Sequence, residues 1–263
     1  AASDTGGSHS DGVTSNNQPT ITGTAEANST VTVYVDGTAV GTATADSTGA
    51  WSYNLASSLA DGNHSLKATA TDAAGNVSGQ SSAKSITVDT SAPDAPAGLG
   101  LSTASDTGSS HSDGVTSNNQ PTITGTAEAN STVTVYVDGT AVGTATADST
   151  GAWSYNLASS LADGNHSLKA TATDAAGNVS GQSSAKKITV DTSAPNAPAG
   201  LGLSAASDTG SSHSDGVTSN NQPTITGTAE ANRRPATPAA ATATASPATT
   251  SRRSPAPRKR TAR

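Results

Sequence analysis

The chain has 263 residues, of which 32% are hydrophobic and none is Phe, Met or Cys. The lack of Cys excludes disulfides, cysteine catalysis and thiolate metal sites, and no apolar run reaches the ~18 residues that a membrane-spanning helix needs. Charge divides the chain, because residues 1–232 hold all 20 acidic residues and five Lys, a formal charge of −15, whereas residues 233–263 hold eight basic residues and no acidic one.

The sequence repeats itself with a period of 102 residues. Residues 1–102 and 103–204 differ at four positions, and a third copy runs from Ala205 to Asn232. A repeat of this length has the size of an independent domain and is too long for one unit of a solenoid. We therefore predict tandem domains, each built around its own core.

The second copy supplies the predicted elements in chain order. Short strand-like segments lie at 96–102, 121–124, 132–139, 141–147, 153–157, 167–173 and 187–190. Apolar and polar residues alternate in most of them, and turn residues follow about every ten positions, which predicts half-buried antiparallel strands. The Asp-Gly pair at 138–139 predicts a two-residue hairpin turn. Six or seven such strands in about 100 residues predict a β-sandwich.

Two of these strands indicate which side faces the core. The inward set comprises Trp153, Tyr155, Leu157, Leu168, Ala170 and Ala172. Lys169 and Thr171 are expected to face solvent because they alternate with the apolar residues. Trp153 and Tyr155 could instead line a sugar-binding face, but their alternation with Leu157 favours a place in the core.

The phase of the repeat follows from the segment PAGLGLS at 96–102, which recurs at 198–204. This segment can supply the first strand of the domain that follows it. The chain then divides into a domain without its first strand (1–92), a complete domain (93–194), a truncated domain with two strands (195–232) and a tail (233–263).

The loop SDTGSSHSDGVTSNN, residues 105–119, has almost the same sequence in all three copies. Successive antiparallel strands reverse direction, which places this loop at the same end of the domain as the loop 161–167 and the exit segment 190–195. The opposite end carries the loop 174–178. The acidic loop of one domain is therefore expected at the junction with the next.

Three stretches carry a resemblance to a known family: PTITGTAEANSTVTVYVDG, GAWSYNLASSLADGNHSLKATATDAAGN and ITVDTSAPDAP. They resemble the bacterial immunoglobulin-like tandem repeats of large surface and secreted adhesins, and the resemblance covers residues 1–232. It implies an all-β fold of tandem seven-strand Ig-like β-sandwiches, with the first and last copies incomplete. It also implies a stalk, in several such proteins with calcium at the domain junctions.

Calcium takes six to eight oxygen ligands from carboxylates, carbonyls and water. The candidate ligands are the junction-loop aspartates Asp4, Asp11, Asp61, Asp89, Asp106, Asp113, Asp163 and Asp191. Oxygens of Asp174 or Asn178 could be added from the neighbouring domain. The loop lacks the spacing of an EF-hand. The alternative is that the Asp-Gly and Asp-Thr-Gly sequences only form turns.

No catalytic residue is predicted. His111 lies between Ser110 and Ser112 and near Asp113, but a triad needs members held by separate rigid elements together with an oxyanion donor. His166 is expected in a solvated loop, because no second His stands at zinc-ligand spacing.

After Asn232 the sequence no longer matches the repeat and is rich in Ala, Pro and Arg. Such a composition cannot form a packed core, so disorder is expected. A shifted reading frame is one explanation of its origin. A basic arm for nucleic acid or membrane is another, although no aromatic residue is present to stack on bases.

These observations predict a non-enzymatic spacer of a bacterial extracellular adhesin, secreted or on the cell surface, that supports cell adhesion or biofilm formation. Its expected partners are neighbouring repeats, together with a host or abiotic surface bound by parts outside this chain; nucleic acid is not expected. The chain begins without Met and without a recognisable signal peptide, so we expect a piece of a longer protein. A glycan-binding module and an accessory module of an extracellular enzyme remain the alternatives.

Overall fold

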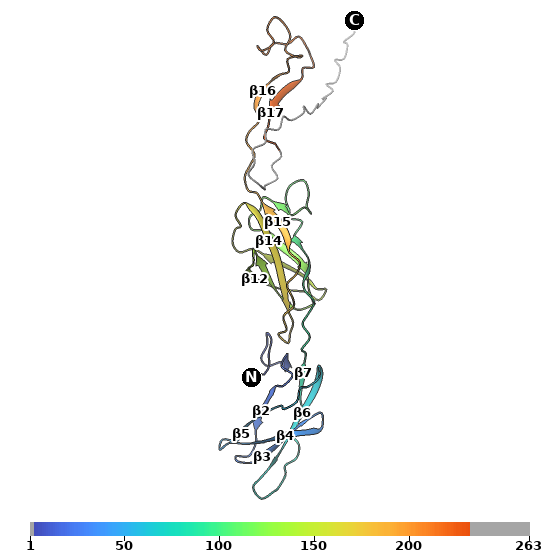
Figure 1. Ribbon diagram of the computed structural model, residues 1–263, viewed down its shortest axis with the longest axis vertical. Coiled ribbons are helices and arrows are strands. Elements are labelled where there is room, and N and C mark those ends of the chain that lie inside the picture. The colour runs from blue at the N-terminus through green and yellow to red at the C-terminus, as the bar shows by residue number, and fades with distance from the viewer. Residues whose placement is uncertain (1–2, 232–263) are drawn as a thin grey trace, which may run out of the picture. The chain divides into compact units, whose positions relative to one another are not determined.

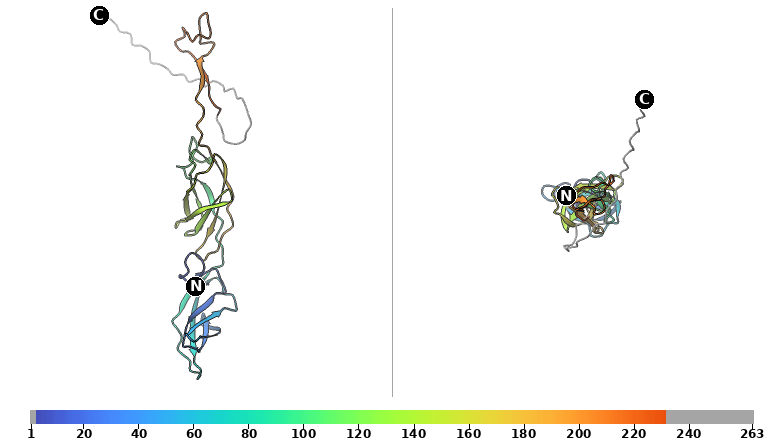
Figure 2. Two further views of the ribbon diagram at one scale, coloured as in Figure 1. Left: turned by 90° about the vertical axis from the view of Figure 1, so that its left-hand side faces the viewer. Right: turned by 90° about the horizontal axis from the view of Figure 1, so that it is seen from above.

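The computed structural model describes residues 3–231, and every regular element in this range is a β-strand (Figure 1). Two further directions of view show the same strands (Figure 2). The chain divides into two compact units, residues 1–192 and 193–263. The predicted disordered tail at 233–263 lies outside the described residues. Within residues 3–231, no helix has the length and apolar character that a membrane crossing requires.

The first repeat contains seven strands. They are β1 (Val13–Thr14), β2 (Thr20–Thr24), β3 (Thr30–Val35), β4 (Thr38–Thr44), β5 (Ala50–Asn54), β6 (Gly62–Thr71) and β7 (Lys84–Val88). One sheet has the order β1-β7-β6-β3-β4 and the other is the antiparallel pair β2-β5.

The second repeat has one strand more. Its strands are β8 (Ala97–Leu101), β9 (Val115–Thr116), β10 (Thr122–Thr126), β11 (Thr132–Val137), β12 (Thr140–Thr146), β13 (Ala152–Asn156), β14 (Gly164–Thr173) and β15 (Lys186–Val190). They form the sheets β13-β10-β8 and β12-β11-β14-β15-β9. The segment PAGLGLS thus contributes β8 beside β10, with Leu101 opposite Ile123. The predicted all-β sandwich fold is confirmed.

The second unit contains two described strands, β16 (Ala199–Leu203) and β17 (Ile225–Thr228), which form an antiparallel pair. Both strands lie within residues 195–232, which the sequence assigns to a truncated third copy. Leu201 is 74% exposed and Ile225 is 69% exposed, because no second sheet covers them within the described part of this unit.

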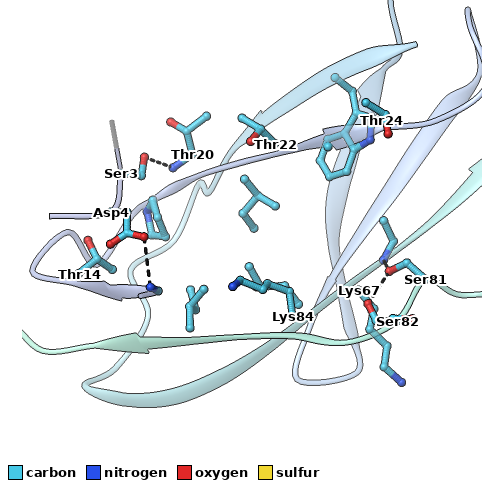
Figure 3. A pocket seen from close by; sticks show the side chains of 18 residues that line it. Ser3, Asp4, Thr14, Thr20, Thr22, Thr24, Lys67, Ser81, Ser82 and Lys84 are labelled. Atoms are coloured by element: carbon cyan, nitrogen blue, oxygen red, sulfur yellow. Dashed lines mark hydrogen bonds between the residues drawn. The ribbon is translucent and has the colours of Figure 1, made fainter. Parts of the chain in front are cut away.

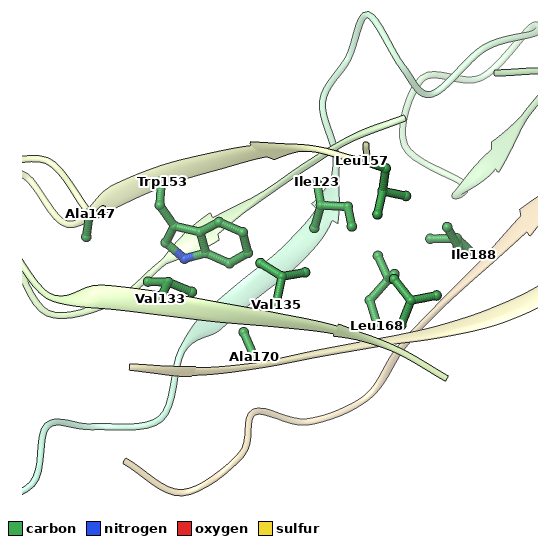
Figure 4. Packing of buried hydrophobic residues seen from close by; sticks show 10 residues of the cluster. Ile123, Val133, Val135, Ala147, Trp153, Leu157, Leu168, Ala170 and Ile188 are labelled. Atoms are coloured by element: carbon green, nitrogen blue, oxygen red, sulfur yellow. The ribbon is translucent and has the colours of Figure 1, made fainter. Parts of the chain in front are cut away.

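The core of the second repeat lies between its two sheets (Figure 4). Val133, Val135 and Ala170 enter from one sheet, and Ile123 and Trp153 face them from the other. Trp153 is 4% exposed, which agrees with its expected place in the core. The hydroxyl of Tyr155 donates to the main-chain oxygen of Val142 at 2.6 Å, so the polar end of this half-buried ring is satisfied.

The hairpin between β11 and β12 shows how the sequence sets local structure. Asp138 and Gly139 have φ angles of 51° and 83°. Positive φ at both central residues defines the type I′ turn, whose twist matches that of the flanking strands. The predicted Asp-Gly turn is confirmed.

Two details differ from the prediction. The short strand β9 pairs with β15 in parallel, not antiparallel, with Val115 opposite Thr189. Thr171 is buried, at 7% exposure, although it was expected to face solvent. The segment 180–183 runs along β14 at this point, with Ser180 and Ser183 bonded to the backbone on either side of Thr171.

Candidate functional site at the junction of two repeats

The repeated acidic loop closes on itself in each copy. In the second repeat, one carboxylate oxygen of Asp106 accepts the Gly114 N–H at 3.0 Å. The main-chain oxygen of Asp106 accepts a hydrogen bond from His111 Nδ1 at 2.6 Å. The same pair of bonds forms around Asp4 in the first repeat and Asp208 in the third. Through Nδ1, the histidine therefore helps to close the loop.

The other carboxylate oxygen of Asp106 is buried without a hydrogen-bond partner, and so is that of Asp4 and of Asp208. A buried carboxylate oxygen with free lone pairs can accept a cation or a water molecule. The Asp106 side chain belongs to a residue that is 3% exposed, so this oxygen lies inside the loop and away from solvent.

Four further candidate aspartates either form local turns or bind an exit segment. Asp11 and Asp113 each accept the N–H of the residue two positions later, at 3.0 Å, which is an Asx turn. Asp61 and Asp163 bind the exit segment, since each accepts the N–H and the hydroxyl of the threonine that follows β7 or β15, respectively.

The last two candidates lie at the exits of the repeats. Asp89 accepts the Ser91 N–H at 3.1 Å. The Asp191 N–H donates to the Thr116 oxygen at 2.9 Å, which closes the end of the second repeat.

Two hydrogen bonds connect the first repeat directly to the second. Thr5 Oγ1 donates to the main-chain oxygen of Ala176 at 2.6 Å. Asn178 Nδ2 donates to the main-chain oxygen of Asp89 at 2.7 Å. The acidic loop and exit of one repeat therefore contact the loop 174–178 of the next, at the two ends that the strand order predicted.

The burial of this loop differs between identical sequences. Ala176 is 1% exposed, whereas its equivalent in the first repeat, Ala74, is exposed. The backbone is also close, because a Cβ on Gly6 would overlap the carbonyl of Ala175 and one on Gly177 would lie 2.9 Å from the Gly6 nitrogen. At the equivalent Gly108 and Gly75 a Cβ would meet no atom within 4 Å. The two repeats therefore approach so closely here that only glycine, which has no side chain, can stand at Gly6 and Gly177 without a clash.

Asp11 and Asp174 are the two carboxylates that border a common hollow at this junction, which also contains Asn130 and Thr132. Oxygen donors of this kind suit calcium. Among residues 3–231, however, no three acidic or histidine side chains gather closely enough to hold a metal ion. The residues therefore fit calcium in ligand type, but main-chain oxygens and water would have to complete its coordination.

A second polar feature recurs beside the hairpin turns. His166 Nδ1 lies 2.7 Å from Asp138 Oδ2 and its Nε2 lies 2.9 Å from the Ala162 oxygen. Since both ring nitrogens face acceptors, the doubly protonated ring makes both bonds. Partial burial lowers the pKa of His166, but the Ala162 and Asp138 oxygens outweigh it, and the pKa lies above its usual value. His166 is half-buried, not in the solvated setting expected from the sequence.

The first repeat contains the same arrangement. The Ala60 carbonyl and then the Asp36 carboxylate raise the pKa of His64. The Ser65 N–H and then His64 lower the pKa of Asp36. In both copies the pair ties the β3–β4 or β11–β12 turn to the following long strand, which is a structural role.

Several junction residues carried no signal in the sequence. Thr5, Gly6 and Ala176 look like ordinary turn residues, and only the contact between repeats distinguishes them. Asn178, expected as a possible oxygen ligand of calcium, also donates its amide N–H to the main-chain oxygen of Asp89.

The comparisons with known proteins agree with this architecture. The sequence model of the bacterial Ig-like domain matches residues 1–90 and 94–192, which is most of the chain. The chain therefore belongs to the bacterial Ig-like domain family. A comparison with curated proteins found no match.

Three bacterial proteins are among the solved structures to which the chain is similar. The fibronectin(III)-like modules of Clostridium thermocellum CbhA are 21% identical, with 68% of this chain and 87% of that chain covered and a TM-score of 0.42. A Ca²⁺-stabilized adhesin with which an Antarctic bacterium binds ice is 29% identical, over 74% and 50% of the two chains, with a TM-score of 0.38. A 1.5-MDa bacterial ice-binding adhesin is 27% identical, over 69% and 60%, with a TM-score of 0.36. This chain thus spans half of the length of the Antarctic adhesin structure.

Proposed function

We propose that the chain is a non-catalytic spacer from a bacterial extracellular adhesin, in which successive Ig-like repeats are held in a defined register by contacts at their ends. The observation that carries this proposal is the pair of bonds from Thr5 to Ala176 and from Asn178 to Asp89. All four residues recur in the near-identical copies, so the same junction can be propagated along a longer array. A role in cell adhesion or biofilm formation and a place on the cell surface belong to this proposal.

Calcium at the junction is the second part of the proposal. Asp11 and Asp174 would supply carboxylate oxygens from two different repeats, and their mutual repulsion in a chain segment of −15 charge would be removed by a divalent cation. Extracellular modules bind calcium with dissociation constants of ~10⁻⁴–10⁻³ M. Such a site adds only about 1.4 kcal/mol at a ligand concentration ten times the dissociation constant, enough to bias a short junction without being needed for folding.

Small-angle scattering of the full chain with 5 mM calcium and with chelator tests this part. We expect calcium to narrow the distribution of distances between the first two repeats, and Asp11→Asn with Asp174→Asn to abolish the response. Asp113→Asn is the matched control, because the third copy stops at Asn232 before it reaches the loop equivalent to 174–178. Identical scattering with and without calcium would remove calcium from the proposal and leave the spacer role untouched.

Glycan binding is the second candidate. The first repeat has a surface that is both polar and aromatic. It is formed by the exposed Thr side chains of β2 and the half-buried Trp51. A glycan screen on the full chain separates the two roles, because a spacer binds no sugar while a lectin-like module would lose binding on Trp51→Ala without unfolding.

A further inference from the structure

The larger sheet of each repeat ends in a strand pair whose direction sets it apart. β9 pairs with β15 in parallel, with Val115 opposite Thr189 and Thr116 opposite Val190. Among the strand pairs within residues 3–231, only β9–β15 and its equivalent β1–β7 are parallel, and every other pair is antiparallel. β9 lies near the start of its repeat and β15 at the end, so this terminal pair joins the two ends of one domain.

The parallel direction decides how the terminal pair responds to tension. A pull on the two ends of the repeat draws β9 toward its N-terminal end and β15 toward its C-terminal end. Because the strands run the same way, the two pulls are opposite and lie along the strands, which is shear. Bonds between strands in shear must break together, whereas an antiparallel terminal pair is pulled from one end and opens bond by bond. β8 belongs to the other sheet, so its release would leave β9 and β15 joined.

Main-chain hydrogen bonds hold the terminal pair at both ends. The Thr189 N–H donates to the Gly114 oxygen at 2.8 Å, and the Asp191 N–H donates to the Thr116 oxygen at 2.9 Å. Thr116 and Val190 are buried. Water therefore has little access to these bonds, and they have no ready substitute partner when the strands begin to slide.

The acidic loop braces β9. The Gly114 N–H donates to an Asp106 carboxylate oxygen at 3.0 Å, and the Thr116 hydroxyl donates to the main-chain oxygen of Ser105 at 2.6 Å. Ser105 and Asp106 are themselves buried. A strand of two residues is shorter than most strands. The loop therefore gives this short strand a fixed position beside β15, which is a use of its repeated sequence that needs no bound ion.

The first repeat contains the same terminal pair. The Thr87 N–H donates to the Gly12 oxygen at 2.8 Å, and the Asp89 N–H donates to the Thr14 oxygen at 2.9 Å. The Gly12 N–H donates to the Asp4 carboxylate at 3.2 Å, as Gly114 does to its own aspartate. The arrangement is therefore a property of the repeated sequence.

We propose that the terminal pair of each repeat, β9–β15 and β1–β7, is a shear clamp that makes the repeat resist unfolding under tension. The proposal rests on the spacer role, because a spacer between two attached bodies is pulled along its length. Forced unfolding is governed by the unfolding rate and not by the equilibrium free energy. A repeat with a small core can therefore resist tension without a high thermal stability.

Single-molecule force spectroscopy of the full chain in two pulling directions tests the clamp. The chain has no native Cys, so handles can be attached at exposed positions changed to Cys. Ala95→Cys with Ala194→Cys pulls the second repeat through its two ends and loads the terminal pair in shear. Ser112→Cys with Ala185→Cys pulls β9 and β15 from their N-terminal ends and separates them bond by bond. We expect a several-fold higher unfolding force in the first direction at the same loading rate. An equal or lower force would overturn the proposal.

A pair of variants separates the clamp from general stability. Thr189→Pro removes the N–H that Gly114 accepts. Val135→Ala is the control, since it leaves a cavity in the core and lowers the thermal midpoint without touching the terminal pair. We expect Thr189→Pro to lose more unfolding force per degree of thermal midpoint lost than Val135→Ala, and equal ratios would contradict the clamp.

The comparison of pulling directions does not depend on these variants, because its handles are at exposed positions outside the strands. It also lies within one repeat. The clamp can therefore fail this test while the scattering experiment still supports the spacer role, and the reverse outcome is equally recognisable.

Discussion

Asn178 in the second repeat donates from Nδ2 to the main-chain oxygen of Asp89 in the first, and also to a carboxylate oxygen of Asp174 in its own loop. Within residues 3–231, the side-chain amide of the equivalent Asn76 makes only the local bond, to Asp72. One asparagine therefore serves both the turn and the junction, and its twin serves the turn alone. This pair gives the molecule an internal control for the contact between repeats.

Asn178→Ala should destabilise the second repeat more than Asn76→Ala destabilises the first. The local bond is lost in both variants, and only Asn178→Ala also loses the bond to Asp89. A single neutral hydrogen bond contributes about 0.5–1.5 kcal/mol, which is the expected difference between the two variants. Urea unfolding of the full chain, followed by circular dichroism, measures it. Equal losses would mean that the junction bond adds nothing to stability.

Gly6→Ala should loosen the junction while Gly108→Ala leaves it intact. Both glycines have positive φ, +91° and +101°, so an alanine costs ~1–2 kcal/mol of local strain in either place. Only at Gly6 does the new methyl group also run into the backbone of Ala175. We expect scattering curves of Gly6→Ala to show a broader distribution of distances between the repeats. A change of the same size in Gly108→Ala would show that the effect is local strain.

The core and the turns could be read from the sequence because they depend on local patterns. Trp153 alternates with Leu157 and is buried, and the Asp138-Gly139 pair adopts the turn it predicts. Thr171 was misplaced because its cover comes from the segment 180–183, whose Ser-rich sequence has no strand periodicity. A segment outside the sheet can bury a residue without changing the alternation of apolar and polar residues along the strand, so this burial could not be predicted from the pattern.

The junction could be predicted only in outline. Strand direction identified the two ends that meet, but Ala74 and Ala176 have identical surroundings in sequence and opposite burial. No local signal distinguishes them, because the difference lies in which repeat stands next to each. The part played by the eight aspartates in binding calcium stays a prediction. Their hydrogen bonds show structural uses for several of them, because Asp11 and Asp113 form Asx turns and Asp61 binds the exit segment.

Trp153→Ala should be more damaging than Trp51→Ala. A fully packed tryptophan costs about 3–5 kcal/mol when it is truncated, since a cavity remains. Trp51 is half-buried and is one of the residues that line an open hollow of the first repeat (Figure 3), so water can enter the space that its truncation leaves. Differential scanning calorimetry of the two variants compares the losses, which should be smaller for Trp51→Ala. Equal losses would mean that the hollow beside Trp51 is closed in solution.

The His64–Asp36 and His166–Asp138 pairs should make stability depend on pH. Each histidine has its pKa raised above 6.5, so its contribution is fully present below that value and is lost as pH rises through the raised pKa. Each aspartate has its pKa lowered below 3.8, so its contribution is present above that value and is lost as pH falls through the lowered pKa. The pairs are therefore most stabilising between about pH 4 and pH 6.5.

Since Asp36 and Asp138 are about half exposed, each pair contributes no more than about 1 kcal/mol. Thermal unfolding at pH 5.5 and pH 8.5 should show a fall in midpoint that shrinks in the double variant His64→Gln with His166→Gln. That variant keeps His9, His111 and His213, so the difference from the native chain isolates the two pairs. If both proteins lose the same number of degrees between the two pH values, the ring nitrogens are not holding a second proton and the turns are stabilised by the Asp-to-backbone bonds alone.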